Sequence, residues 1–464
     1  MKYVKKVLIT AVIAMAICLL AAGTLVFIRY QKYAADFSKL KSASYDTVFF
    51  SMYPIENYDE ADYTFFRGMN IVKSAAVISD SDVLKRYMDI AAGTENVIDT
   101  VYLGIDPVVT DTEDIFQITL ENPGTMFEIV LAYPEINYWL SMDREACQKV
   151  WETYREFAGN VLGLENVRVY YFCNEEWLLC NPGNYEDTFL TNEAVSEILM
   201  CYSDYQHNNI LNVNNFHDRF NRAWELIEQY RETPAVYPDL SAIEIIFFGD
   251  SVIGNYADSM SVPGVINGLT GAAVYNCGYG GRSAAYGPKG FESAPEIVRA
   301  FIEQDLAAVP KESQVYAGIE EYIQTGELNK KKIFVFNYGL NDYFEGLPIR
   351  TEDIYDISSY TGAIRTAVCA LKEVYPEAGI LLLTPNQTIE FDYGKEIRSE
   401  QGGKLQDYAD ALLVLADQMN VNVLDHYRQL PIDMEKHWEL LQDGTHPNAQ
   451  GRFLMGKLIT DFLK

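Results

Sequence analysis

Short apolar runs rich in β-branched and aromatic residues alternate along this chain with longer amphipathic segments of helical period. Helical periodicity is clear in Arg144–Phe157 and Glu193–Tyr202. Because parallel strands need long crossovers between them, the alternation predicts an α/β fold with a parallel sheet and helices on both faces. The strands expected in the first half are Thr47–Phe50, Thr100–Leu103, Phe127–Leu131 and Arg168–Phe172.

The same pattern begins again in the second half. A polar helical stretch near Asn215–Arg231 and the breaker-containing segment Thr233–Asp239 come before it. With 464 residues and a prior of about 150 residues per domain, the chain is long enough for more than one core. We therefore expect two three-layer α/β/α domains with flavodoxin-like parallel sheets, residues 45–235 and 236–464. The strands expected in the second are Glu244–Phe248, Ala272–Tyr275, Ile333–Phe336, Ile380–Thr384 and Val421–Leu424.

An uncharged apolar run, Val7 to Ile28, lies near the N-terminus with three lysines before it and Arg29 and Lys32 after it. About 20 apolar residues suffice to cross a bilayer, and the apolar part of a cleavable signal peptide is usually shorter. The sequence therefore predicts an uncleaved anchor in residues 1–29, a juxtamembrane linker in residues 30–44, and a single-pass protein whose folded part lies outside the cell membrane.

Net charge and cysteine spacing argue against nucleic-acid binding and metal binding. A formal net charge of −30 repels phosphate backbones, so nucleic acid is not expected as a partner. The seven cysteines are scattered without the spacing of zinc ligands, so no metal site is expected.

Four short segments of the second half carry groups that could do chemistry. Phe248-Gly249-Asp250-Ser251 places a serine where a strand turns into a helix, although Gly-Asp-Ser is also an ordinary helix N-cap sequence. Asp443-Gly444-Thr445-His446 has a spacing at which a carboxylate orients an imidazole, although it also suits a turn with a solvated histidine. The other two are Asn276–Gly281, which can present a backbone N–H, and Tyr338–Asp342, whose Asn341 amide can donate to an oxyanion; both also fit plain turns.

Together and in this order, the four segments resemble the SGNH hydrolase family, also called the GDSL esterases and lipases, over roughly Ser241 to Lys464. The resemblance implies a nucleophile at Ser251 and a base at His446, oriented by Asp443. It also implies an oxyanion hole formed by the backbone of Ser251 and Gly281 with the side chain of Asn341. Histidines His426 and His437 are expected to be structural or solvated.

The implied reaction is acyl transfer without a metal or organic cofactor. The substrate is expected to be a small ester or a cell-envelope carbohydrate with ester-linked acyl groups, for which acetyl is the expected group. Water or a sugar hydroxyl accepts the acyl group. A membrane acyltransferase partner fits the second case. The alternative is a non-catalytic glycan-binding or scaffold protein of the cell surface.

The two halves also share short identities in the same order, which suggests an internal duplication. Setting Phe49–Phe50 on Phe247–Phe248 places Tyr53 at the position of Ser251; other pairs place Val72 at Gly281, Asp106 at Asn341, Leu190 at His446 and Asp187 at Asp443. The first half therefore lacks the nucleophile and the base, and we expect it to be an inert SGNH-like domain that binds carbohydrate or covers the active copy.

Overall fold

The protein is described by a computed structural model that covers most of the second half and parts of the first. The described residues are 47–50, 71–74, 85, 88–89, 99–105, 108, 112–131, 133–170, 175–186, 189–191, 194, 211–287, 292–435 and 437–464. Within these ranges, no helix has the length and apolar character needed to cross a bilayer. The expected span, Val7 to Ile28, lies outside them, as does most of the expected helix Glu193–Tyr202.

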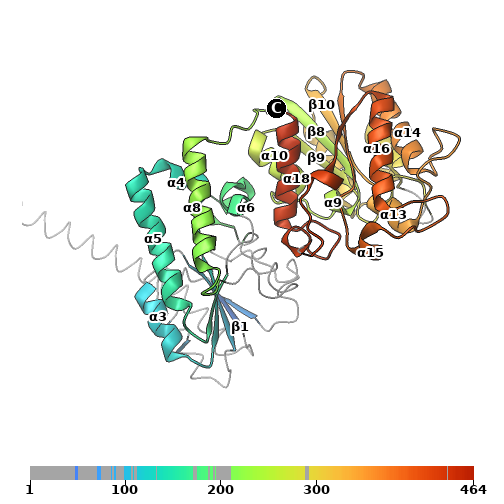
Figure 1. Ribbon diagram of the computed structural model, residues 1–464. Helices are drawn as coiled ribbons and strands as arrows, with labels where there is room; N and C mark the ends of the chain where they lie inside the picture. Colours follow the sequence, from blue (N-terminus) through green and yellow to red (C-terminus); the bar gives the residue numbers. More distant parts are fainter. Residues whose placement is uncertain are drawn as a thin grey trace, which may run out of the picture.

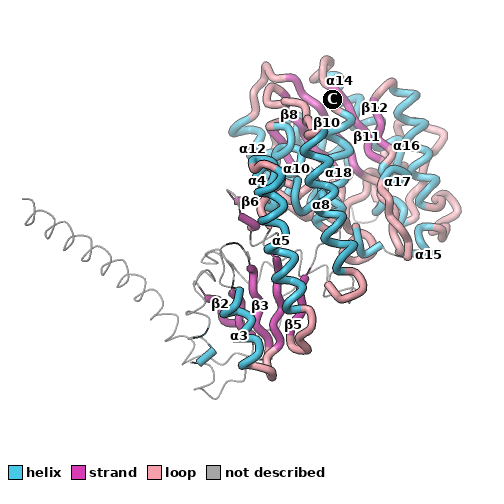
Figure 2. Tube along the Cα trace, turned by 60° about the vertical axis from the view of Figure 1, so that its left-hand side comes forward, coloured by secondary structure: helices cyan, strands magenta, loops and turns pink. Residues whose placement is uncertain are grey.

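The first half contains a five-stranded parallel sheet in the order β2-β1-β3-β4-β5. Helix α5 packs against β5 and also contacts α8 (Figure 2). The strands are β1 (Thr47–Phe50), β2 (Ile71–Ser74), β3 (Thr100–Ile105), β4 (Met126–Leu131) and β5 (Val167–Tyr170). The longer helices are α3 (Thr112–Glu121), α4 (Ile136–Ser141), α5 (Arg144–Val161), α6 (Glu175–Cys180) and α8 (Phe216–Glu232). A 3-10 turn, η3 (Pro182–Asn184), leads into a short hairpin of β6 (Tyr185–Glu186) and β7 (Phe189–Leu190).

The second half forms another five-stranded parallel sheet, in the order β12-β11-β10-β8-β9. Its strands are β8 (Ile243–Gly249), β9 (Ala273–Gly278), β10 (Lys331–Asn337), β11 (Gly379–Leu383) and β12 (Asn422–Leu424). The helices between and after them are α9 (Ser251–Gly254), α10 (Val262–Thr270), α11 (Ala294–Glu303), α12 (Gln314–Thr325), α13 (Leu340–Glu345), α14 (Tyr360–Val374), α15 (Glu390–Gly394), α16 (Leu405–Met419), α17 (His426–Gln429) and α18 (Ala449–Phe462), with 3-10 turns η4 (Leu306–Ala308) and η5 (His437–Glu439).

Helices cover the second sheet in two groups. Helices α10 and α18 pack against each other, while α14 packs with both α11 and α16. In Figure 1 the strands β8, β9 and β10 lie between the pair α10 and α18 and the pair α14 and α16. Apolar side chains fill the space: Ile246, Phe247 and Phe248 of β8 are completely buried. A mixed α/β fold with parallel sheets is therefore confirmed.

Counted within each half, both sheets have the strand order 2-1-3-4-5, which is that of flavodoxin-like folds. One pair in the sequence alignment of the two halves does not match the structure. Val72 lies inside β2, in register with Val48, whereas Gly281 comes after the end of β9. Of the other first-half residues in that alignment, Tyr53, Asp106 and Asp187 lie outside the described residues.

The two halves are packed together through α6 and η3 of the first and α10 and α18 of the second. Lys457 of α18 lies 3.7 Å from Glu176 of α6, and Ser259 Oγ donates to the carbonyl of Gly183 over 3.3 Å. The apolar core of the first half also includes side chains of the second: Met260, Val265, Ala449 and Phe453. The helix that follows the expected histidine motif is therefore part of this shared core.

Candidate active site

Ser251 lies at the carboxyl end of β8, where the chain turns into α9. The turn is held by neighbours on both sides: Asp250 N donates to Asn337 O of β10 over 3.1 Å, and Tyr279 N donates to Gly249 O over 2.8 Å. Asp250 is the helix N-cap, since its side chain accepts from Val252 N at 3.0 Å. The N-cap interpretation of Gly-Asp-Ser thus applies to Asp250, while Ser251 begins the helix.

A pair of glycines lets α9 approach β9. A Cβ on Gly254 would lie 2.6 Å from the carbonyl carbon of Gly278, and a Cβ on Gly278 would lie 2.7 Å from Gly254 N. Because real Cβ atoms do not approach backbone this closely, neither residue can carry a side chain without displacing the helix. The contact fixes α9, and with it Ser251, against the adjacent strand.

Ser251, His446 and Asp443 form one hydrogen-bonded relay. His446 Nε2 lies 2.8 Å from Ser251 Oγ, and His446 Nδ1 lies 2.6 Å from Asp443 Oδ2. The other carboxylate oxygen of Asp443 accepts from the backbone N–H of His446 at 2.8 Å and of Thr445 at 3.0 Å. An ionised carboxylate only accepts, so Nδ1 carries the ring proton and Nε2 is left to accept from the serine hydroxyl.

The electrostatics of the relay favour this assignment. Burial alone would raise the pKa of Asp443, but hydrogen bonds from the His446 ring and backbone outweigh it and lower the pKa to about 2. The hydrogen bond to Asp443 raises the pKa of His446 above its ordinary value, against the opposing effect of burial. Asp443 is therefore ionised near neutral pH, and His446 is a stronger base than a free imidazole.

A loop after β11 supports the turn that carries His446. Asn386 Nδ2 donates to Thr445 O over 3.0 Å, and the hydroxyls of Thr388 and Thr445 lie 2.9 Å apart. The backbone N–H of Ile389 donates to Gly444 O at 2.9 Å. Asn386 and Thr388 are fully buried. These two residues could not be predicted because nothing in the sequence links this loop to a turn more than fifty residues later.

Besides Ser251 itself, the other two expected oxyanion donors lie close to the serine turn. Gly281 has a φ of +73°, a conformation that glycine adopts readily, and a Cβ on the preceding Gly280 would lie 3.8 Å from Ser251 Cβ. The side chain of Asn341, 9% exposed at the start of α13, hydrogen-bonds to the carboxylate of Asp250. All five site residues expected from the sequence are therefore gathered at the carboxyl ends of β8, β9 and β10 and in the loop before α18.

Two buried carboxyl groups, for which the sequence predicted no role, adjoin these donors. Burial raises the pKa of Asp250 to about 6 and that of Asp342 to about 7. Each directly adjoins an expected site residue in the sequence, so position alone could have drawn attention to them. Their hydrogen-bond partners, however, could not be read from the sequence.

The other histidines of this half lie apart from the relay. His426 is fully buried at the start of α17, where burial lowers its pKa to about 4, so it is neutral and structural. His437 begins η5, and its Nδ1 lies 3.3 Å from Met434 O. Among the described residues, no group of His, Cys, Asp or Glu side chains is arranged to hold a metal ion.

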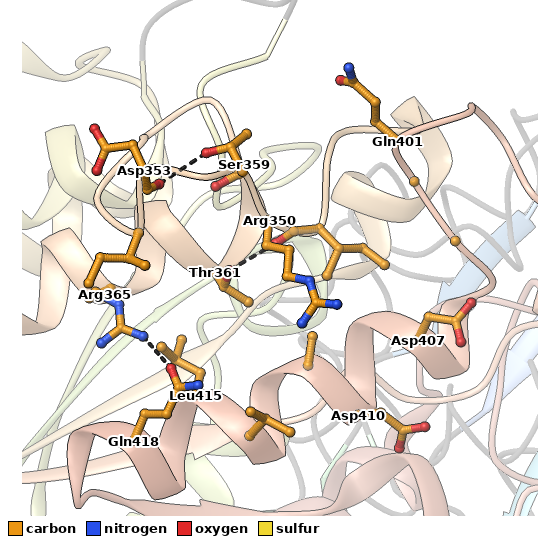
Figure 3. A pocket seen from close by; sticks show the side chains of 17 residues that line it. Arg350, Asp353, Ser359, Thr361, Arg365, Gln401, Asp407, Asp410, Leu415 and Gln418 are labelled. Atoms are coloured by element: carbon orange, nitrogen blue, oxygen red, sulfur yellow. Dashed lines mark hydrogen bonds between the residues drawn. The ribbon is translucent and has the colours of Figure 1, made fainter.

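A separate cavity of about 760 Å³ opens between α14, α16 and the loops that precede them (Figure 3). Arg350 points into it, and Arg365 on one side donates to Gln418. Asp407 and Asp410 line the opposite side. None of the five expected site residues lines this cavity, so it is distinct from the relay.

Residues 247–452 match the model of the family described as GDSL-like Lipase/Acylhydrolase. None of the curated proteins matches the chain significantly. Similar solved structures include a protein from Lactobacillus plantarum, 16% identical, which covers 49% of this chain and 97% of its own with a TM-score of 0.37. Two others cover 47% of this chain and 97% of their own with a TM-score of 0.31: a possible lipase from Chitinophaga pinensis, 16% identical, and a carbohydrate acetylesterase from Sinorhizobium meliloti, 15% identical.

Proposed function

Because residues 247–452 belong to the GDSL-like lipase/acylhydrolases, as the four motifs predicted, we propose that this chain is a serine esterase or O-acyltransferase whose nucleophile is Ser251. The observation that carries the proposal is the pair of short contacts made by His446, 2.8 Å to Ser251 Oγ and 2.6 Å to Asp443 Oδ2. A nucleophile bonded to a base that is itself oriented by a carboxylate is the arrangement that acyl transfer requires.

In the proposed reaction, Ser251 Oγ attacks the carbonyl carbon of an ester while His446 Nε2 takes its proton. The charge that develops on the carbonyl oxygen is held by the backbone N–H groups of Ser251 and Gly281 and by the Asn341 amide. The C–O bond to the alcohol then breaks, and His446 returns the proton to the leaving oxygen. Water, or a sugar hydroxyl in a transferase, then attacks the acyl carbon with His446 again acting as base. The bond between the acyl carbon and Ser251 Oγ breaks, and His446 returns the proton to Oγ.

We propose acylated, mainly acetylated, carbohydrate of the cell envelope as the substrate. The support comes from the uncharged run Val7 to Ile28, which is long enough to span the cell membrane. Such an anchor would hold the folded part at the outer face of the cell membrane, within reach of envelope glycans. An acyltransferase would use a membrane partner to supply its acyl groups, whereas an esterase needs water alone.

Product analysis tests the function and separates the two reactions. The purified protein is incubated with O-acetylated glycan, with and without an unacetylated acceptor, and free acetate and acceptor mass are followed by mass spectrometry. Acetate release that is lost in Ser251→Ala indicates an esterase, and acetyl transfer to the acceptor indicates a transferase. If the wild type does neither and also leaves p-nitrophenyl acetate intact, the non-catalytic glycan-binding alternative is favoured instead.

The anchor is tested separately by fractionation. We expect the full chain to sediment with membranes and to be accessible to protease added outside intact cells. The matched control is the same chain without residues 1–44, which we expect in the soluble fraction. Recovery of the full chain in the soluble fraction would contradict the proposed location while leaving the chemistry open to its own test.

A further inference from the structure

Asp342 joins two loops that are distant in the sequence. It follows Asn341 in the first turn of α13 and is fully buried. Its Oδ2 accepts from the backbone N–H of Ala284 at 2.9 Å, and its Oδ1 accepts from that of Ala285 at 3.0 Å. One carboxylate therefore holds two successive N–H groups of the segment that carries Gly281.

The segment from Gly280 to Ala285 is fixed at both ends. At one end, a Cβ on Gly280 would lie 2.5 Å from Asn255 Oδ1 and 3.8 Å from Ser251 Cβ, so the backbone lies close against the serine turn. At the other end, Ala284 O accepts from Ala294 N at 3.0 Å, and Ala285 O accepts from Ser283 Oγ at 2.8 Å. The carbonyl groups of Ala284 and Ala285 thus accept hydrogen bonds from residues near them in the sequence, whereas their N–H groups donate to Asp342 in α13.

Only a carboxylate presents two equivalent acceptors to two neighbouring N–H groups; an amide has one oxygen and would turn its NH₂ group toward the second N–H. Burying a carboxylate is costly, and here burial raises its pKa to about 7 despite the two backbone donors. Burial thus disfavours the charge on this group, and the hydrogen bonds from the two backbone N–H groups offset part of that cost.

We propose that Asp342 is a positioning residue that holds the Gly281 segment and the Asn341 turn at a fixed separation, so that their two donors converge on one oxyanion. This inference rests on the proposed function. An error of about 1 Å in such a donor can cost about 100-fold in rate, which is why a fixed link between the two loops matters.

The test uses the full chain with Asp342→Asn, Asp342→Ala and Glu244→Gln. Glu244 is the matched control: it is also a fully buried carboxylate that holds a loop, accepting from Glu327 N at 2.6 Å and Lys332 Nζ at 2.7 Å, but it lies at the opposite end of the sheet. Turnover of p-nitrophenyl acetate is measured per active site, counted by fluorophosphonate labelling. This normalisation removes any loss that comes only from unfolded protein.

For Asp342→Asn we expect kcat and kcat/KM to fall together by about 10- to 100-fold, with KM within about twofold, because the lost interaction acts in the transition state. Asp342→Ala should fall further, since no acceptor remains. Glu244→Gln should lower the unfolding temperature and keep kcat per labelled site within about twofold. An Asp342→Asn variant with wild-type kcat per labelled site would overturn the inference.

A readout independent of turnover keeps the inference separate from the proposed function. Amide hydrogen exchange of peptides that cover Tyr279–Tyr286 should be at least about 10-fold faster in Asp342→Asn than in the wild type and unchanged in Glu244→Gln. Unaltered exchange in Asp342→Asn would overturn the positioning role. An inactive wild type with the expected exchange pattern would instead count against the proposed reaction.

Discussion

His446 Nε2 lies 2.8 Å from Ser251 Oγ although the two residues are 195 positions apart in the chain. The serine follows β8, and the histidine lies in the loop before α18, the final helix of the second half. Hydrogen bonds from neighbouring strand ends hold the serine turn, and the loop after β11 holds the histidine turn. The relay therefore depends on backbone contacts from several parts of the sheet.

The pH dependence of kcat/KM should report His446 together with Asp342, whose carboxylate is proposed to hold the oxyanion donors and whose pKa is raised to about 7. Only the neutral imidazole can accept the serine proton, and the bond to Asp443 raises its pKa above the ordinary value of 6.5. Activity should accordingly rise with pH along an acid limb whose midpoint lies above 6.5. A midpoint near 4, where the buried His426 titrates, would identify the wrong histidine.

Asp443→Asn should leave a folded protein with a much weaker base. The amide cannot hold Nδ1–H as the ionised carboxylate does, so we expect kcat to fall by about 10⁴-fold and the acid limb to move to lower pH. The control is Asp425→Asn beside His426, which should leave both quantities unchanged. A fall of less than tenfold in Asp443→Asn would show that the imidazole does not depend on this carboxylate.

Arg452→Met should lower activity by changing the distance between the turn that carries Ser251 and the turn that carries His446. The buried guanidinium donates to Met260 O and Pro447 O, each at 3.0 Å, and its central carbon lies 3.7 Å from the centroid of the Tyr256 ring. Because Pro447 follows His446, we expect kcat to fall by about tenfold together with a lower unfolding temperature.

The control for this substitution is Arg428→Met, which removes an exposed arginine from its pairs with Asp410 and Asp425. Exposed ion pairs contribute little, so its kcat and unfolding temperature should stay close to those of the wild type. Equal losses in both variants would mean that Arg452 has no particular role.

Asp342→Asn should change how stability depends on pH. The pKa of Asp342 is raised to about 7 in the folded protein from an ordinary value of 3.8. As pH rises between these values, the unfolded chain releases this proton first, so the wild type loses stability across that window. The neutral amide has no such loss.

The comparison is made by thermal unfolding at pH 4.5 and pH 7.5. The difference in unfolding temperature, Asp342→Asn minus wild type, should be more positive at pH 7.5 than at pH 4.5. This holds even if loss of the acceptor lowers the unfolding temperature of the variant at both pH values. A difference that does not vary with pH would show that Asp342 is ionised in the folded protein throughout this range.

The strands and the convergence of the motifs could be predicted from the sequence because the underlying patterns are local. Apolar runs mark β8, β10 and β11, and the carboxyl ends of parallel strands necessarily meet at one edge. The strand β2 was missed because only its first two residues, Ile71 and Val72, are apolar and the polar Lys73 and Ser74 follow them. The sequence alignment of Val72 with Gly281 was wrong because a few short identities do not fix how two stretches of sequence align.

The links between loops could not be predicted. The two N–H groups bound by Asp342 lie 57 and 58 positions earlier, and nothing in the Asn-Asp dipeptide distinguishes this role from an ordinary turn. The same holds for Asn386 and Arg452, because both donate to backbone carbonyls and such bonds leave no residue-specific trace in the sequence.

The proposed activation of Ser251 by His446 can be tested by reacting the purified protein with a fluorophosphonate and identifying the labelled peptide by mass spectrometry. We predict one adduct per chain, on Ser251, that is absent in Ser251→Ala and forms at least about 100-fold more slowly in His446→Ala. Labelling of another residue, or equal labelling rates in wild type and His446→Ala, would show that His446 does not activate Ser251 as the nucleophile.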